Sequence, residues 1–417
     1  MTIKHLKRLL IIVGILIVFK VTANDKSGEI IKDQTKGIED TTSNGASKKV
    51  FEKLFKEEHA ESKGLINIHK IEDKLYFEIP TSIFGRDMLL GSTVSETSDN
   101  GNVIVGSKPL APILVNFSME NEKVLLNKVI NNSITLPSDT NISNAIDKNH
   151  MGAIMALFKV ETYNPDSTAV VVDVTNFFKS DNTDLTTFDR SSEYASMGEQ
   201  TNIFQQERSF ITEFKSFGDN LFVRSSLSYN TTVKGRRGNL FTDKPYTVIA
   251  TRSFLLLDEK PYNYRIADYR IGVFNSGKIM FSDKGNKAKD LHFAHRWRLE
   301  PSDIAKYKKG ELVEPIKPII FYMDSDFPEW WKPYLKEGIE RWNDAYEEIG
   351  FKNAVKVVEF PKDDPEFDPD NIKYSCIRYA PIKVENAMGP SWVDPRSGEI
   401  INASVYVYHD VIKLLNN

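Results

Sequence analysis

The sequence predicts an α+β protein in which a long β-rich region precedes a smaller α/β segment. Three observations support this fold class. From residue 64 onward, short apolar runs alternate with turn-forming residues, as in antiparallel strands. After residue 315, a continuous apolar run precedes one long helix with apolar residues three or four positions apart. The 417-residue chain is 41% hydrophobic, which is enough apolar material for sizeable cores.

The first 47 residues are interpreted as an export signal and a tether. Basic residues precede an apolar run at 9–19, and Val21-Thr22-Ala23 is typical of a cleavage site. The run is shorter than the roughly 20 residues that span a bilayer. We predict a cleaved signal peptide at 1–23 and a flexible polar tether at 24–47, with an uncleaved anchor as the alternative because Lys20 interrupts the approach to the site. The mature chain is expected to be periplasmic, at the outer surface or secreted, with no stable membrane span.

A small α+β domain is predicted at 48–95 and a β-rich domain at 96–300. The first begins with a short amphipathic helix near residues 50–55 and continues as strands. Strands of the two domains are expected at 65–70, 74–79, 87–92, 111–117, 123–129, 152–162, 169–174, 221–230 and 246–257, with a brief helix at 142–147. The basic loop at 234–238 is interpreted as a solvated hairpin tip, and an interaction site is the alternative.

Residues 301–417 are predicted to form a partial α/β domain. A strand buried on both faces is expected at 319–323, followed by a helix that Gly350 closes. The apolar stripe of this helix is interpreted as core and consists of Trp331, Leu335, Ile339, Trp342, Tyr346 and Ile349. Further strands are expected at 355–360, 374–380 and 400–409, with a tight turn at 394–398.

Few side chains suggest chemistry by themselves. The single cysteine, Cys376, lies between apolar residues and is interpreted as a buried strand residue rather than a nucleophile. His292 and His295 could share a metal on a helix, but a structural role is favoured because no third ligand accompanies them. Three other histidines stand alone and are expected to be structural or solvated: His59, His69 and His150.

An acidic loop follows residue 361. Its carboxylates could bind calcium, but their spacing fits no EF-hand, so a solvated loop is favoured; they are Asp363, Asp364, Glu366, Asp368 and Asp370. Basic and acidic residues nearly balance, at 54 and 58, and the charges are interspersed. This balance indicates no nucleic-acid partner.

Several stretches together resemble one family, the large secreted bacterial zinc-dependent metalloproteases. Chains of that family carry two uncharacterised β-rich domains ahead of a met-zincin catalytic domain. The similar stretches keep their order along nearly everything after residue 51 and are FKEEHAESKGLINIHKIEDKLYFEIP, YNPDSTAVVVDVTNFF, RWRLEP, GELVEPIKPIIFYMD, WWKPYLKEGIERWNDAYEEIGFKNA, NAMGPSWVDPRSGEI and YVYHDVIKLL. The resemblance implies that 301–417 is the N-terminal half of a zincin-like domain.

The same resemblance implies a chemistry and a substrate. In the family, a helix bearing HExxH and a further histidine hold zinc, the glutamate is the general base, and a polypeptide is cleaved. HExxH does not occur in the printed sequence, so we expect no catalytic residues, no zinc and no peptidase activity for this chain alone. The resemblance places the rim of the substrate cleft at Asn386, Ala387, Met388, Gly389, Pro390, Ser391 and Trp392. A plain hairpin is the alternative for this stretch.

Two functions follow as hypotheses. The first is the N-terminal portion of a secreted zinc-dependent metalloendopeptidase that ends before its zinc-binding helix. The second is a non-catalytic secreted or cell-surface binding protein that retains the β-rich domains. Under the first hypothesis, residues 315–417 are expected to be loosely folded alone, since a missing helix would leave apolar side chains uncovered.

Overall fold

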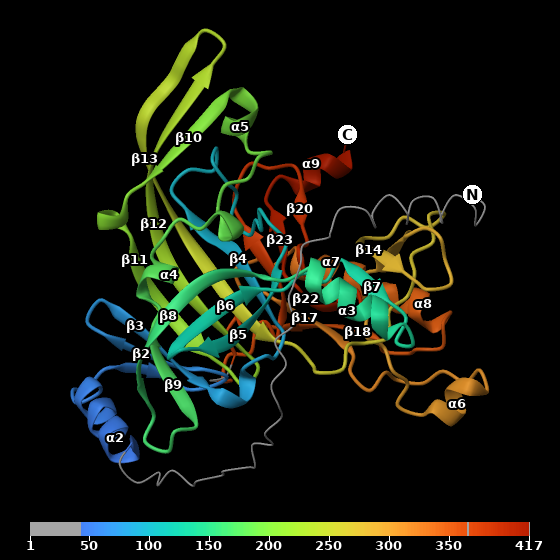
Figure 1. Cartoon of the computed structure of the whole chain (residues 1–417). Helices are drawn as coiled ribbons and strands as arrows, with labels where there is room; N and C mark the ends of the chain where they lie inside the picture. Colours follow the sequence, from blue (N-terminus) through green and yellow to red (C-terminus); the bar gives the residue numbers. More distant parts are fainter. Residues whose placement is uncertain (1–42, 365–366, 417) are drawn as a thin grey trace, which may run out of the picture. The chain divides into compact units, whose positions relative to one another are not determined.

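The computed structural model describes residues 43–364 and 367–416 (Figure 1). The signal peptide predicted at 1–23 and most of the tether predicted at 24–47 lie outside these residues. The first described helix, α2 (Ser43–Leu54), begins inside the stretch expected to be tether, so the tether prediction is wrong for its last five positions. No helix in the described ranges is long and apolar enough to cross a membrane.

A 12-stranded antiparallel sheet contains most of the strands. Its order is β1-β2-β3-β9-β8-β6-β5-β4-β13-β12-β10, and β11 also pairs with β12. The strands are β1 (Ala60–Ser62), β2 (Asn67–Ile71), β3 (Lys74–Pro80), β4 (Met88–Thr97), β5 (Ile113–Glu120), β6 (Lys123–Lys128), β8 (Ala153–Tyr163), β9 (Ala169–Asp173), β10 (Glu199–Phe204), β11 (Phe210–Ser216), β12 (Asn220–Gly235) and β13 (Gly238–Leu256). The chain is therefore β-rich and of the α+β class.

Every strand predicted before residue 257 is present, but the longest hairpin extends further than expected. β12 and β13 continue through residues 231–245 and leave only Arg236 and Arg237 between them. Thr231, Thr232 and Val233 are β-branched, which favours extended backbone and explains the continuation. Both arginines at the tip are exposed, as the interpretation of a solvated tip requires.

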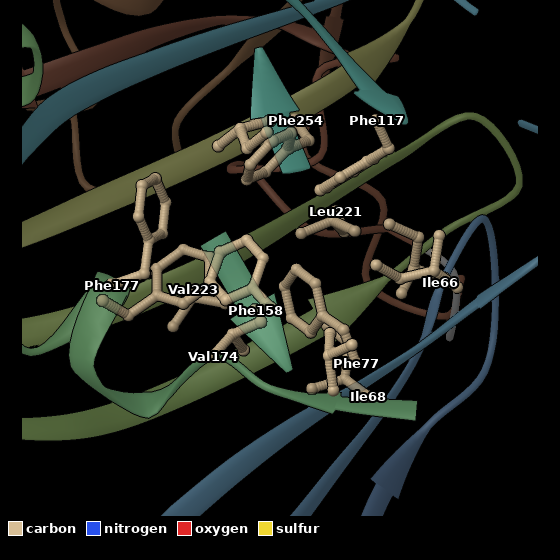
Figure 2. Close-up of a cluster of buried hydrophobic side chains, with 14 of the residues drawn as sticks. Ile66, Ile68, Phe77, Phe117, Phe158, Val174, Phe177, Leu221, Val223 and Phe254 are labelled. Atoms are coloured by element: carbon tan, nitrogen blue, oxygen red, sulfur yellow. The ribbon is translucent and has the colours of Figure 1, made fainter. Parts of the chain in front are cut away.

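The large sheet curls until its first strands meet β11. The amide of Leu65 donates to the carbonyl of Phe217 at 2.6 Å, and the amide of Ser216 donates to the Ser62 hydroxyl at 2.9 Å. The enclosed core contains Phe77, Phe254 and their neighbours from strands on both sides of residue 96 (Figure 2). The segments 48–95 and 96–300 thus share one sheet and one core.

A five-stranded sheet forms the C-terminal part, in the order β18-β17-β19-β23-β20. Its first four strands are parallel and β20 is antiparallel. The strands are β17 (Ile319–Met323), β18 (Val355–Glu359), β19 (Ser375–Ala380), β20 (Ala387–Met388) and β23 (Val405–Tyr408). The remaining strands form two small sheets. One contains β7 (Ser133–Thr135), β14 (Asn275–Phe281) and β15 (Lys289–Ala294). The other contains β16 (Arg296–Trp297), β21 (Ser391–Asp394) and β22 (Glu399–Ala403).

The other α-helices in the described ranges are shorter than α2. They are α3 (Thr140–Asn149), α4 (Thr175–Phe178), α5 (Glu193–Met197), α6 (Ile304–Lys308), α7 (Lys332–Glu340), α8 (Trp342–Glu347) and α9 (Val411–Asn416). The single long helix predicted after Trp331 is wrong, because it divides at Arg341 into α7 and α8. Beyond this break Trp342 and Ile349 of the stripe are 65% and 55% exposed, whereas Tyr346 still packs against the small core around Phe351.

Two strand predictions in this region also need correction. The strand expected at 400–409 divides at Ser404, because β22 pairs with β21 whereas β23 joins the parallel sheet. β17 is central but is not buried on both faces. Ile319 and Met323 are buried, whereas Ile320 and Tyr322 are half-buried because they line a hollow of about 460 Å³.

Candidate functional site

The predicted rim divides between two sheets. Ala387 and Met388 form β20, the edge strand beside β23, whereas Ser391 and Trp392 begin β21. Trp392 is buried, so it lies beneath the rim rather than on its surface.

The hydrogen-bond pattern shows which rim atoms face outward. Met388 lies opposite Tyr406, and the carbonyl of Pro390 accepts from the amide of Ser404 at 3.2 Å. In an antiparallel pair, the residues between such positions direct their backbone groups away from the partner strand. Ala387 and Gly389 therefore present their amides and carbonyls at the free edge. Asn386 Oδ1 already accepts from the amide of Ala387 at 2.8 Å.

Hollows flank the rim on two sides. One of about 620 Å³ lies between Asn386 and Met388 of the rim and Asp189 and Glu193 of the large β-rich part. A second, of about 320 Å³, is lined by Gly389 and Pro390 together with Phe274 and His295. Both volumes lie within or near the range of ligand sites, about 300–1,000 Å³.

A loop from the β-rich part packs under the same edge. The connection between β4 and β5 reaches the C-terminal sheet, where the Tyr408 hydroxyl donates to the carbonyl of Val105 at 3.1 Å. Gly106 has φ +86°, and a Cβ there would come within 2.2 Å of the Tyr406 ring. Only glycine fits this contact, so the loop is held closely against β23.

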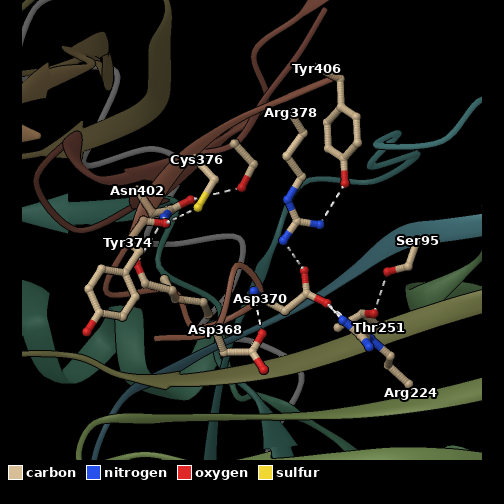
Figure 3. A network of polar contacts seen from close by, with 12 residues as sticks. Ser95, Arg224, Thr251, Asp368, Asp370, Tyr374, Cys376, Arg378, Asn402 and Tyr406 are labelled. Carbon is tan, nitrogen blue, oxygen red and sulfur yellow. Dashed lines mark hydrogen bonds and ion pairs between the residues drawn. The ribbon is translucent and has the colours of Figure 1, made fainter. Parts of the chain in front are cut away.

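Part-buried ion pairs join the acidic loop to the large sheet. The Asp370 carboxylate accepts from Arg378 at 2.6 Å and from Arg224 Nε at 3.1 Å, and Arg378 also donates to the Tyr406 hydroxyl at 3.0 Å (Figure 3). Asp368 pairs with Lys215. The expectation of a solvated loop is therefore wrong for both aspartates, because cations from β11, β12 and β19 surround them.

Burial and the neighbouring arginines shift the pKa of Asp370 in opposite directions. Burial favours the neutral acid, but the positive charges of Arg378 and Arg224 outweigh it and hold the pKa of Asp370 below its ordinary value. The carboxylate is therefore charged, and its charge is balanced by hydrogen-bonded guanidinium groups.

The histidines do not assemble as their spacing suggested. His59 and His69, expected to stand alone, lie 3.1 Å apart between Nε2 and Nδ1, and His69 Nε2 is 3.0 Å from Glu78. His292 lies on strand β15 and its Nδ1 is 2.9 Å from Asn275 Oδ1. His295 follows the strand and its Nε2 is 2.9 Å from Ser276 Oγ. The two histidines therefore have separate partners.

Cys376 is buried in β19, which confirms its interpretation as a strand residue. Burial raises the pKa of its thiol to about 12, so the thiolate that a nucleophile requires is disfavoured.

The chain matches two family models. Residues 108–302 match a domain of unknown function (DUF5117), and residues 48–97 match another domain of unknown function (DUF5118). Neither a curated protein nor a solved structure matches.

Sequence reasoning missed the side chains that join the two large sheets. Arg224 and Asp370 are 146 positions apart, and Lys108 lies in a loop without regular structure. The only local signal was the mixture of proline and acidic residues at 361–370, which is equally typical of exposed loops.

Proposed function

We propose that this chain is the N-terminal part of a secreted zinc-dependent metalloendopeptidase, in which residues 386–392 bind an extended polypeptide substrate. The observation that carries the proposal is the antiparallel edge between two hollows, where the Ala387 carbonyl and the backbone of Gly389 face outward while Asn386 already accepts from the Ala387 amide. An edge strand offers unpaired backbone donors and acceptors, to which a peptide can add as a further strand.

The neighbouring structure supports a role in binding side chains as well as backbone. Successive side chains of an extended peptide point to opposite faces, so a strand added at this edge would direct them alternately toward the two sides of the sheet. The hollow of about 620 Å³ offers Met388 on its apolar wall and charged groups of both signs, from Asp189, Glu193 and Lys383. The resemblance of seven sequence stretches to the metalloprotease family supplies the reaction class.

Zinc does not fit the residues that the structure describes. Within 43–364 and 367–416, no group of three or more histidine, cysteine, aspartate or glutamate side chains is arranged to hold a metal ion. The proposal for these residues is therefore confined to substrate binding, and the chemical step is assigned to no side chain here.

The first test is to read the genomic DNA beyond codon 417 in all three forward frames. An HExxH helix with a nearby histidine is expected there, and the complete product is expected to hydrolyse casein in a chelator-sensitive manner. A clean stop without such a helix would remove the peptidase proposal and favour the secreted binding protein.

The rim is tested separately in the complete product. Gly389→Pro removes the outward amide, whereas Gly389→Ala retains it, and a Cβ at this position meets only Val405 at 3.8 Å. We expect kcat/KM for a peptide substrate to fall about tenfold in the proline variant, as one lost hydrogen bond of about 1.4 kcal/mol would give, and to change little in the alanine variant. Equal activity of both variants would contradict peptide binding at this edge.

A further inference from the structure

The hollow of about 460 Å³ lies on one face of the central strand β17. Side chains of a strand alternate between faces, so Ile320 and Tyr322 lie on one side of the sheet and Phe321 on the other. Phe321 packs in the core to which α7 contributes Leu335 and Ile339. Parallel sheets are normally covered on both faces, whereas here the face of Ile320 and Tyr322 is only half-covered.

The walls of this hollow are mainly apolar. The small sheet supplies Trp297 of β16 and Ile400 of β22, which pair with each other. Tyr374 also lines the hollow, and its ring centre is 5.0 Å from that of Tyr322. Small-molecule sites have volumes of about 300–1,000 Å³ and are lined by apolar and aromatic side chains with a few polar groups. The hollow therefore has the size and the walls of a site for an apolar body.

The charged side chains of the hollow are unevenly paired. They are Arg298, Lys317, Lys373, Asp258 and Glu399. Both carboxylates contact the arginine, because Glu399 accepts two hydrogen bonds from Arg298 at 2.7 Å each and Asp258 lies 3.5 Å from it.

The two lysines remain without a counter-charge. In the described part of the chain, neither Lys317 nor Lys373 has a carboxylate partner, and both are exposed. The Lys373 Nζ lies 5.3 Å from the centre of the Tyr374 ring, so this ammonium group is beside the aromatic wall. The hollow thus combines an apolar surface with two positive charges that are free to pair with a ligand.

We propose that this hollow binds a small organic anion with an apolar body and a carboxylate head. The body covers Ile320 and the aromatic rings, and the carboxylate pairs with the ammonium groups of Lys317 and Lys373. A ligand with a positive head would be repelled by the same two lysines, and a neutral one would gain nothing from them. The site shares no residue with 386–392, so this inference is independent of the proposed peptidase.

Equilibrium dialysis of the purified chain against carbon-14-labelled octanoate tests the binding. We expect one octanoate per chain, with a Kd on the order of 0.1 mM, as is usual for a ligand of about ten non-hydrogen atoms. 1-Octanol and octyltrimethylammonium have the same alkyl chain without the negative head. Each should therefore displace octanoate about tenfold less well than unlabelled octanoate does, or more weakly still.

Variants then locate the site. Replacing both lysines, by Lys317→Met with Lys373→Met, keeps apolar side chains of similar length and should weaken octanoate binding about tenfold. The matched control is Lys308→Met with Lys309→Met, which removes two exposed charges that do not line the hollow and should leave the Kd unchanged. Ile320→Glu places a carboxylate in the hollow and should abolish saturable binding.

Three results would overturn the proposal. Absence of saturable octanoate binding by the unmodified chain does so without any variant. Equal displacement by octyltrimethylammonium and by unlabelled octanoate would rule out recognition of a negative head. Unchanged octanoate affinity in the folded double lysine variant would place the ligand elsewhere. Stronger competition by N-acetylphenylalanine than by octanoate would support the proposal and assign the ligand as the carboxyl end of a peptide rather than a fatty acid.

Discussion

The two large sheets of this protein cover their apolar residues in different ways. The 12-stranded sheet curls around its own core, in which Phe77 and Phe254 are each 1% exposed. The five-stranded sheet is open, and helices α7 and α8 beside it leave Trp330 and Trp342 about two-thirds exposed, at 64% and 65%. A sheet that closes on itself supplies its own cover, whereas an open sheet depends on segments from elsewhere in the chain.

Part of the missing cover comes from the β-rich region. Ile104 and Val105 pack against Tyr406 and Tyr408, and Ile372 and Trp392 pack against leucines of β4, β5 and β13. The ion pairs of Asp368 and Asp370 lie beside these contacts. The C-terminal sheet is therefore covered in part by the β-rich region. The expectation that residues 315–417 are loosely folded alone stays a prediction, which limited proteolysis tests.

The largest expected effect is in the closed core. Phe254→Ala should lower the free energy of unfolding by about 3–5 kcal/mol, because the side chain is fully buried and stacks on Phe117 at 5.9 Å between ring centres. Urea denaturation measures the loss. The control Phe254→Leu should lose less, and a loss under 1 kcal/mol for the alanine variant would contradict the description of this core as closed.

The next effect concerns the connection between the sheets. Asp370→Asn should lower the free energy of unfolding by about 3 kcal/mol, because the largely buried Arg378 then loses its carboxylate partner and Arg224 keeps only Glu213. Asp363→Asn, in the same loop, is the control. In the Asp370 variant, limited proteolysis should cut the C-terminal sheet faster than the large sheet. Equal rates of cleavage in the two sheets would contradict a main role for Asp370 in holding the C-terminal sheet.

Acid should weaken the same connection. The pKa of Asp370 in the folded chain lies below its unfolded value of about 3.9, so its contribution is complete above that value and is lost as pH falls through the folded pKa. The difference in unfolding free energy between the parent chain and Asp370→Asn should therefore be constant above about pH 5 and shrink below about pH 4. A constant difference down to pH 2 would contradict this assignment.

The contrast between the sheets also explains what sequence could predict. Hairpins of the large sheet such as β8–β9, which the turn Asn164-Pro165-Asp166 joins, can be predicted from local sequence. The pairings of β3 with β9 and of β4 with β13 join distant strands and cannot. The rim prediction relied on resemblance, and its edge position is visible only in the register of β20 with β23. The contacts of Lys108, Arg224 and Asp370 depend on how distant segments pack, and no local sequence pattern predicts that packing.

The smallest expected effect tests the open face. Trp342→Ala should change the free energy of unfolding by no more than about 0.5 kcal/mol, because an exposed side chain loses little on truncation. The matched change Trp331→Ala should cost about 3–5 kcal/mol, since Trp331 is 5% exposed and packs against Phe327 and Tyr379.

Repeating the Trp342 measurement in any longer product of the gene makes the comparison sharper. A loss of 2 kcal/mol or more there, with little loss in this chain, would mean that a further segment covers the outer face of α8. Equally small losses of unfolding free energy in both chains would mean that this face of α8 stays exposed in the longer product as well. In that case the open sheet would be completed by the β-rich region alone, through the loop that carries Lys108.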